Sequence, residues 1–261
     1  MNALLDIGEV ALVLAALASF LAVIEICFRI GRRRTTAEAQ LKAHVSALQA
    51  ALLGLLALLL GFAFAMAVSR FDTRKALVLE ESNAIGTTYL RARLLPEPQR
   101  QELKKLLHSY VDARLAFYDA GTDSVRLGAA NTAAAQLSER LWSLAAGLAE
   151  KDPRSVPLGL FVRSLNDVID LHEKRLQALE NHVPEAVLYL LYGVAAVALG
   201  FVGYGCGLDG QRRTVSTALI SILIALVLMV IIDIDRPRRG LIKVSQDSMI
   251  RLKQSIDQPV Q

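Results

Sequence analysis

Four long apolar blocks that carry almost no charge restrict the fold of this chain more than any other feature. The first covers residues 10–28 and is interrupted only by Glu25, whereas 45–69, 186–208 and 214–232 contain no charged residue. An α-helix rises about 1.5 Å per residue, so about 20 residues cross a hydrocarbon core of roughly 30 Å. The sequence therefore predicts an all-α integral membrane protein with four transmembrane helices.

The positions of these blocks divide the chain into two transmembrane hairpins, a polar region and a tail. The first hairpin occupies 1–69, with spans at about 8–30 and 45–69, and the second occupies 184–232, with spans at about 185–208 and 214–232. Residues 70–183 are expected to form an extramembrane domain. Residues 233–261 form a basic tail in which 245–256 is predicted as a short interfacial helix.

The polar region has the pattern of a four-helix bundle. Phe71, Val78 and Ile85 recur at seven-residue spacing, which is typical of the apolar face of a helix. That helix ends near Pro96, and three further amphipathic stretches follow it with short connections. A helix that leaves the membrane and a fourth that returns to it predict an up-down-up-down arrangement.

Basic residues in short connections indicate the cytoplasmic side of a membrane protein. The two short connections carry Arg29, Arg32, Arg33, Arg34, Lys42, Arg212 and Arg213. This places the helical domain and both termini on the outer side. The basic residues of the tail, from Arg236 to Lys253, favour the opposite orientation.

Composition and motifs argue against several classes of function. The net charge is +4, and no Lys/Arg-rich strip carries interleaved aromatic residues, so we expect no nucleic-acid partner. No nucleophile is paired with a base, and no Gly-rich phosphate loop follows a strand, so the chain is not expected to be an enzyme or to hold a cofactor. Cys27 and Cys206 form neither a disulfide framework nor a zinc-ligand spacing.

Small residues mark the faces on which membrane helices approach closely. The third span has such a stripe, and the second has a shorter one. The residues are Gly61 in the second span and Gly193, Ala196, Gly200 and Gly203 in the third. They indicate packing inside one bundle or, alternatively, contact between subunits.

The spans have no ionisable residue near their centres, so a pore through them would have an apolar constriction. Phe62, Phe64 and Met66 of the second span are the candidates for it. The alternative is that these side chains face lipid or fill the core.

The polar domain carries a candidate contact surface on its first helix. It consists of Glu80, Glu81, Asn83, Thr87 and Arg91, and its alternative interpretation is an ordinary solvated face. Near the end of the domain, Asp170 and His172 invite a metal hypothesis. His172 falls on an apolar stripe, which favours a core histidine, and no metal is expected.

Charged residues gather where the second and fourth spans end, on the side of the polar domain. They would form an interfacial collar that attracts anions or anchors the chain to lipid headgroups. The members are Arg70, Asp72, Arg74, Asp233, Asp235, Arg236, Arg238 and Arg239.

Several of these motifs resemble the bestrophin-like family of bacterial membrane proteins. The matching segments are 61–64 followed by Arg70 and Arg74, the run 81–91, and the later segments 166–172 and 233–246. The resemblance implies kinship with bestrophins, which are pentameric anion channels with an apolar neck on the second span. Bestrophins keep their large domain in the cytosol, whereas the basic connections here predict the reverse.

Two functions remain open at this point. The first is a homo-oligomeric channel in the lipid bilayer of the bacterial inner membrane, with an inorganic anion as its candidate permeant and the helical domain on the periplasmic side. The second is a non-conducting envelope scaffold or sensor whose helical domain binds a partner.

Overall fold

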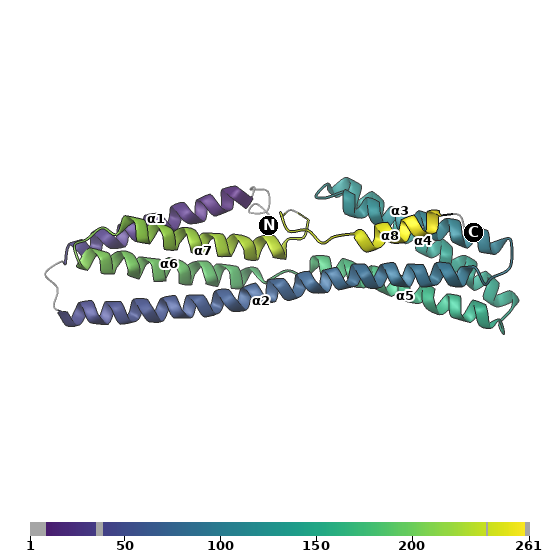
Figure 1. The fold of residues 1–261 in the computed structure, drawn as a ribbon, viewed down its shortest axis with the longest axis horizontal. Helices are drawn as coiled ribbons and strands as arrows, with labels where there is room; N and C mark the ends of the chain where they lie inside the picture. The colour runs from purple at the N-terminus through teal and green to yellow at the C-terminus, as the bar shows by residue number, and fades with distance from the viewer. Residues whose placement is uncertain (1–8, 35–38, 239, 259–261) are drawn as a thin grey trace. The chain divides into compact units, whose positions relative to one another are not determined.

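The computed structural model describes residues 9–34, 39–238 and 240–258, and over these residues it is all-α, without a strand (Figure 1). The helices are α1 (Glu9–Arg32), α2 (Ala39–Ala92), α3 (Gln99–Asp119), α4 (Ser124–Lys151), α5 (Val156–Glu180), α6 (Glu185–Leu208), α7 (Thr214–Asp235) and α8 (Asp247–Asp257). They form two compact units. The predicted fold class, an all-α membrane protein, is confirmed.

Unit 1 comprises Met1–Ser69, His182–Arg236 and Gly240–Ile242, and therefore holds α1, the first part of α2, α6 and α7. Helices of the chain are long and apolar enough to cross a membrane in four places, which lie within Ala11–Arg32, Ala39–Ala92, Val156–Leu208 and Thr214–Asp235. In Figure 1, α6 and α7 run alongside α1.

Close approach of α1 and α6 depends on glycine. A Cβ atom added to Gly203 would lie 2.9 Å from the Cα atom of Ile24, and one added to Gly207 would lie 2.8 Å from the backbone nitrogen of Arg32. A Cβ atom added to Gly200 would lie 3.2 Å from the Cys27 Sγ atom. The α6 backbone thus packs directly on α1, as small-residue faces of membrane helices do.

Unit 2 comprises Arg70–Asn181, Pro237–Arg239 and Lys243–Gln261. The second part of α2 packs with α3, α4 and α5, and the largely apolar interior is built from two clusters of buried residues. Two of the helices begin at side-chain caps. Asp123 accepts the N–H groups of Val125 and Arg126 at 3.0 and 3.1 Å, and Ser155 accepts that of Leu158 at 3.4 Å.

The last helix, α8, differs from the interfacial helix that we expected near the C-terminus. Its apolar side packs on unit 2, where Met249 and Ile256 are buried in one core cluster with Tyr110 and Val168. A short amphipathic helix can bury its apolar side in a membrane interface or in a protein groove. Sequence alone does not distinguish the two.

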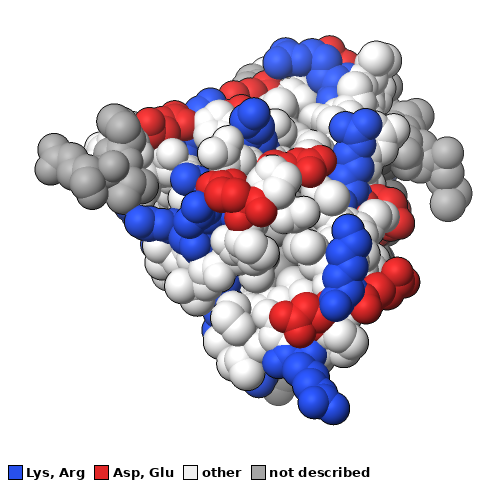
Figure 2. All heavy atoms as spheres, turned by 90° about the vertical axis from the view of Figure 1, so that its right-hand side faces the viewer, with Lys and Arg blue, Asp and Glu red and all other residues white. Residues whose placement is uncertain are grey.

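The face that Figure 2 turns toward the viewer has a mixed surface. Basic and acidic side chains are interspersed there among uncharged residues, and neither sign forms a continuous field. Interspersed charge is typical of a domain surface in contact with water.

Candidate functional site

Helix α2 carries a stripe of exposed residues in unit 1. Leu48, Leu55 and Phe62 stand seven residues apart, and their exposed fractions are 38%, 46% and 60%. Ala51, Leu58 and Ala65 alternate with them at three- and four-residue spacing and are exposed as well. Such spacing places all six on one side of the helix. Within unit 1, α2 is buried only at Val45, Leu56, Ala63 and Ala67, so other helices leave most of its surface uncovered, including this side.

A corresponding stripe lies on the part of α2 that belongs to unit 2. Leu79, Leu90 and Leu94 are 51%, 59% and 62% exposed, and Asn83 lies on the same side of the helix. Leu90 and Leu94 are neighbours on this side, whereas Asn83 separates them from Leu79. A contiguous exposed apolar patch marks an interaction surface.

The predicted polar surface is divided by the structure. Glu80, Asn83 and Thr87 are exposed, and Arg91 is half-buried with one guanidinium N–H donated to the Leu160 carbonyl oxygen at 2.9 Å. Glu81 is not part of this surface, because its side chain is fully buried. Helical neighbours point about 100° apart, so Glu80 and Glu81 serve different sides of α2.

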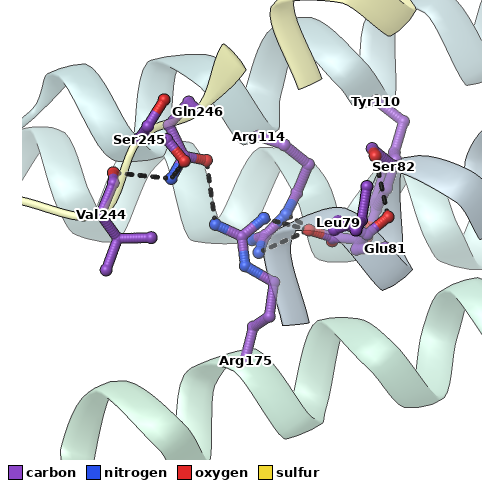
Figure 3. Close-up of polar contacts among 9 residues, drawn as sticks. All are labelled: Leu79, Glu81, Ser82, Tyr110, Arg114, Arg175, Val244, Ser245 and Gln246. Carbon is purple, nitrogen blue, oxygen red and sulfur yellow. Dashed lines mark hydrogen bonds and ion pairs between the residues drawn. The ribbon is translucent and has the colours of Figure 1, made fainter. Parts of the chain in front are cut away.

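Glu81 is the centre of a buried ionic cluster inside unit 2 (Figure 3). The Arg114 Nε atom lies 2.8 Å from Glu81 Oε1, and Arg175 forms a second ion pair with Oε2. The Tyr110 hydroxyl donates to Oε1 at 3.4 Å, and Arg175 also donates to the Gln246 side-chain oxygen at 3.1 Å. The cluster therefore joins α2, α3 and α5 to the segment before α8.

The cluster carries more positive than negative charge. Burial alone would raise the pKa of Glu81, but the guanidinium groups of Arg114 and Arg175 outweigh it and hold that pKa below its usual range. Burial lowers the pKa of Arg175, against the opposing effect of Glu81, and Arg114 adds to the lowering. Within the described part of the chain, the Arg114 Nη1 atom is buried without a hydrogen-bond partner.

Sequence analysis missed Arg114, Arg175 and Gln246. A signal for the two arginines was present, since both occupy apolar-face positions of their helices. Arg114 lies between Tyr110 and Phe117, and Arg175 follows His172 by three residues. A charge in the middle of an apolar stripe indicates a buried partner. No comparable pattern marks Gln246.

The residues predicted as an interfacial collar have separate roles within the two units. In unit 1, Asp233 accepts the backbone N–H groups of Leu241 and Ile242 at 2.7 and 2.9 Å, and both carboxylate oxygens of Asp235 accept that of Val183 at 3.0 Å. These two acids therefore hold chain connections in place. Arg236, in the same unit, is half-buried.

The other collar residues belong to unit 2. Arg74 is buried and donates to the carbonyl oxygens of Ala178 and Asn181, each at 2.9 Å, at the end of α5. Asp72 is exposed, and Arg70 is half-buried. Arg238 lies 4.3 Å from the centre of the Phe117 ring. Arg239 lies outside the described residues.

The three residues proposed for an apolar constriction are all exposed, but they do not share one side of α2. Phe62 and Met66 are four residues apart and face the same way, whereas Phe64 is two residues from each and points to another side of the helix.

The small residues predicted to pack between helices also differ from one another in their contacts. Gly200 and Gly203 contact α1, while a Cβ atom at Gly61 or Gly193 would meet nothing within 4 Å.

His172 and its acidic neighbours do not form a metal site. The described residues contain no group of three histidine, cysteine, aspartate or glutamate side chains placed to hold an ion. Instead, the half-buried His172 ring tilts against Tyr110, with 6.4 Å between the ring centres.

The fold and this site define a class: all-helical membrane proteins with a helical extramembrane domain. The sequence model of the bestrophin-like domain matches residues 11–249, so the chain belongs to the bestrophin-like family. Comparison with the curated proteins gives no match.

Solved structures show the same fold at low sequence identity. One variant of a bacterial bestrophin homologue from Klebsiella pneumoniae has 16% identity and a TM-score of 0.65, and the match covers 92% of this chain and 97% of that one. A second variant of that homologue has 16% identity and a TM-score of 0.65, and the match covers 94% of this chain and 96% of that one. A structure described as a membrane protein has 17% identity and a TM-score of 0.63, and the match covers 93% of this chain and 97% of that one. At these identities the likeness concerns the fold.

Proposed function

We propose that this protein is the subunit of a homo-oligomeric ion channel that conducts inorganic anions. The uncovered stripe of α2 is the observation that carries the proposal. A membrane helix that other helices of the chain cover only along a narrow strip of its unit 1 segment has surface available to line a shared pathway. The kinship with bestrophins, some of which are anion channels, supports the same function.

The stripe in unit 2 supports the oligomer. Exposed apolar side chains of a membrane span contact lipid. Leu79, Leu90 and Leu94 belong to the extramembrane domain, where they would contact water unless a partner covers them. Burying them against a second copy of the chain would remove roughly 25 cal/mol of unfavourable hydration per Å² of apolar surface. The protein would therefore gain stability from a partner along this helix.

Phe62 is the residue proposed for the apolar constriction, with Met66 beside it. It is the aromatic residue of the α2 stripe and is 60% exposed. Rings of large apolar side chains can close a pore by excluding water. The interfacial residues Arg70 and Arg236 would contribute positive charge that attracts anions.

The test is conduction by the purified full-length protein in planar bilayers, with and without substitutions on α2. We expect anion-selective currents, and Phe62→Ala is expected to increase the open probability because it widens the constriction. Phe64→Ala is the matched control, since it removes the same ring from another side of the helix. Absence of anion-selective current in several independent reconstitutions would contradict the proposal.

Cross-linking distinguishes the channel from the envelope scaffold or sensor. A cysteine introduced at exposed Asn83, in a chain whose Cys27 and Cys206 are replaced by Ala, is expected to link two copies of this chain in cell membranes. Capture of a different protein at that position would favour the scaffold.

A further inference from the structure

Unit 2 contains a cavity of about 260 Å³ that is separate from the uncovered stripe of α2. It lies between α2, the end of α3, α5 and the tail residues Pro237, Arg238, Lys243, Val244 and Gln246, all of which belong to unit 2. Its polar lining is dominated by positive charge. The residues are Arg74, Arg175, Arg238, Lys243, Asp119 and Gln246.

Two of these cations have partners inside the protein. Arg175 pairs with Glu81 and donates to Gln246, and the guanidinium group of Arg74 donates to backbone carbonyl oxygens of α5. Arg74, Arg175 and Gln246 are all more than nine-tenths buried. The cavity is therefore bordered by polar groups that the fold holds in place.

Arg238 and Lys243 are the cations available to a ligand. Arg238 makes only long hydrogen bonds, of 3.5 and 3.3 Å, to the carbonyl oxygens of Phe117 and Gly121, besides its contact with the Phe117 ring. Across the residues that the structure describes, neither Arg238 nor Lys243 forms an ion pair. Lys243 and Asp119, the acidic residue of the lining, are both exposed to solvent, whereas Arg238 is half-buried.

Burial and two neighbouring cations act on Arg238. Burial lowers the pKa of its guanidinium group, and the positive charges of Arg114 and Arg175 lower it further. An anion placed beside Arg238 would relieve this repulsion. Guanidinium groups bind carboxylate and phosphate oxygens in pairs, which makes such a ligand chemically suitable.

Apart from Tyr118, the side chains in the rest of the cavity wall are apolar. Leu77, Val78, Leu179 and Val244 line it, so a bare inorganic ion would leave most of the wall without a partner. Ligand sites of this kind combine apolar surface with a few polar groups that orient the ligand. The volume limits the occupant to a small molecule.

We propose that this cavity binds a small organic carboxylate. The carboxylate lies against Arg238 and Lys243, and the apolar part of the molecule lies against Leu77, Val78 and Leu179. This binding is independent of conduction, since the cavity is complete within one unit of one chain.

Isothermal titration calorimetry on the full-length protein in detergent tests the site, with benzoate as the probe and benzyl alcohol as its uncharged analogue. We expect saturable binding of benzoate and no saturable binding of benzyl alcohol. Arg238→Gln is expected to weaken benzoate binding about tenfold or more, because it removes a charge-assisted hydrogen bond. Arg238→Lys keeps the charge and is expected to restore part of the affinity.

Arg126→Gln is the matched control, because Arg126 is exposed on α4 and does not line the cavity. Ala178→Leu places extra atoms in the cavity wall and is expected to abolish binding without removing charge. Melting curves of all variants establish that they are folded. Equal benzoate affinity in Arg238→Gln and wild type would overturn the proposal. Saturable binding of inorganic phosphate or glycerol phosphate in place of benzoate would also overturn it, in favour of a phosphate or lipid-headgroup site.

Discussion

At the scale of single residues, Glu81 is the carboxylate on which the interior of unit 2 depends. It lies between the guanidinium groups of Arg114 and Arg175, and all three side chains are almost completely removed from water. A buried ion pair adds little net stability compared with an apolar pair, but removal of one partner leaves an uncompensated charge. The cluster is therefore intolerant of change at its single acid.

We expect Glu81→Gln to lower the free energy of unfolding by about 3–5 kcal/mol, because it leaves two buried arginines without a counter-charge. Chemical unfolding of the detergent-solubilised protein, followed by circular dichroism, measures the change. Glu80→Gln is the matched control, since Glu80 is the exposed neighbour and surface substitutions stay within about 0.5 kcal/mol. Equal stability of the two variants would refute the prediction.

His172 makes stability depend on pH. Burial, together with the positive charge of Arg114, lowers its pKa to about 4 from 6.5. Between these values the unfolded chain binds a proton that the folded chain does not, so folding stability falls as pH drops from about 6.5 toward 4. The contribution is complete above pH 6.5.

Replacement of His172 by Gln should accordingly flatten the pH dependence of stability between pH 6.5 and 4. Melting temperatures recorded across that interval provide the measurement. His44→Gln, an exposed histidine of α2, serves as control and should leave the slope of the wild type intact. A His172→Gln protein with the wild-type slope would count against this explanation.

At the scale of helices, the contact of α6 with α1 depends on particular glycines. Sequence analysis predicted one small-residue face on the third span, and the structure separates its members. Gly203 contacts the backbone of α1 at Ile24, whereas Gly193 has open space around it. Spacing alone identifies the stripe, but only the position of the neighbouring helix shows where along it the contact occurs.

Gly203→Ala is therefore expected to lower the melting temperature, because its new methyl group meets backbone atoms of Ile24 that cannot turn away. Gly193→Ala should melt at or above the wild-type temperature, since alanine favours helix by up to about 1 kcal/mol over glycine. Thermal unfolding in one detergent compares the pair. The idea fails if Gly203→Ala is as stable as Gly193→Ala.

At the scale of the whole molecule, orientation in the membrane is the property that separates two layouts. The basic short connections predict that the helical domain lies outside, whereas bestrophins keep their large domain in the cytosol. Family membership alone does not decide between them, because insertion follows Lys and Arg counts near the spans.

Labelling of intact cells with a membrane-impermeant maleimide decides the orientation. In a chain whose Cys27 and Cys206 are replaced by Ala, Thr122→Cys between α3 and α4 is expected to react from outside. Gln211→Cys, in the short connection between α6 and α7, should be protected until the membrane is opened. The reverse pattern would establish the bestrophin layout and place the helical domain in the cytosol.

The sequence by itself determined the class of fold, with four apolar helices long enough to span a membrane, and the family. Span length and charge-free composition are local properties, and so are the helix caps and the heptad of Phe71, Val78 and Ile85. What the tertiary structure decided was which polar residues meet. Glu81, Arg114, Arg175 and Gln246 come from separate segments, and their contact depends on how the helices turn about their own axes.

The α2 stripe shows the same division at larger range. Its regular spacing is present in the sequence, but a regular stripe is equally compatible with a buried and an uncovered face. Only the packed helices reveal that other parts of unit 1 bury Leu56 and Ala63 and leave Leu55 and Phe62 exposed. Burial is a relation between segments far apart in sequence, whereas a transmembrane span is defined by its own residues.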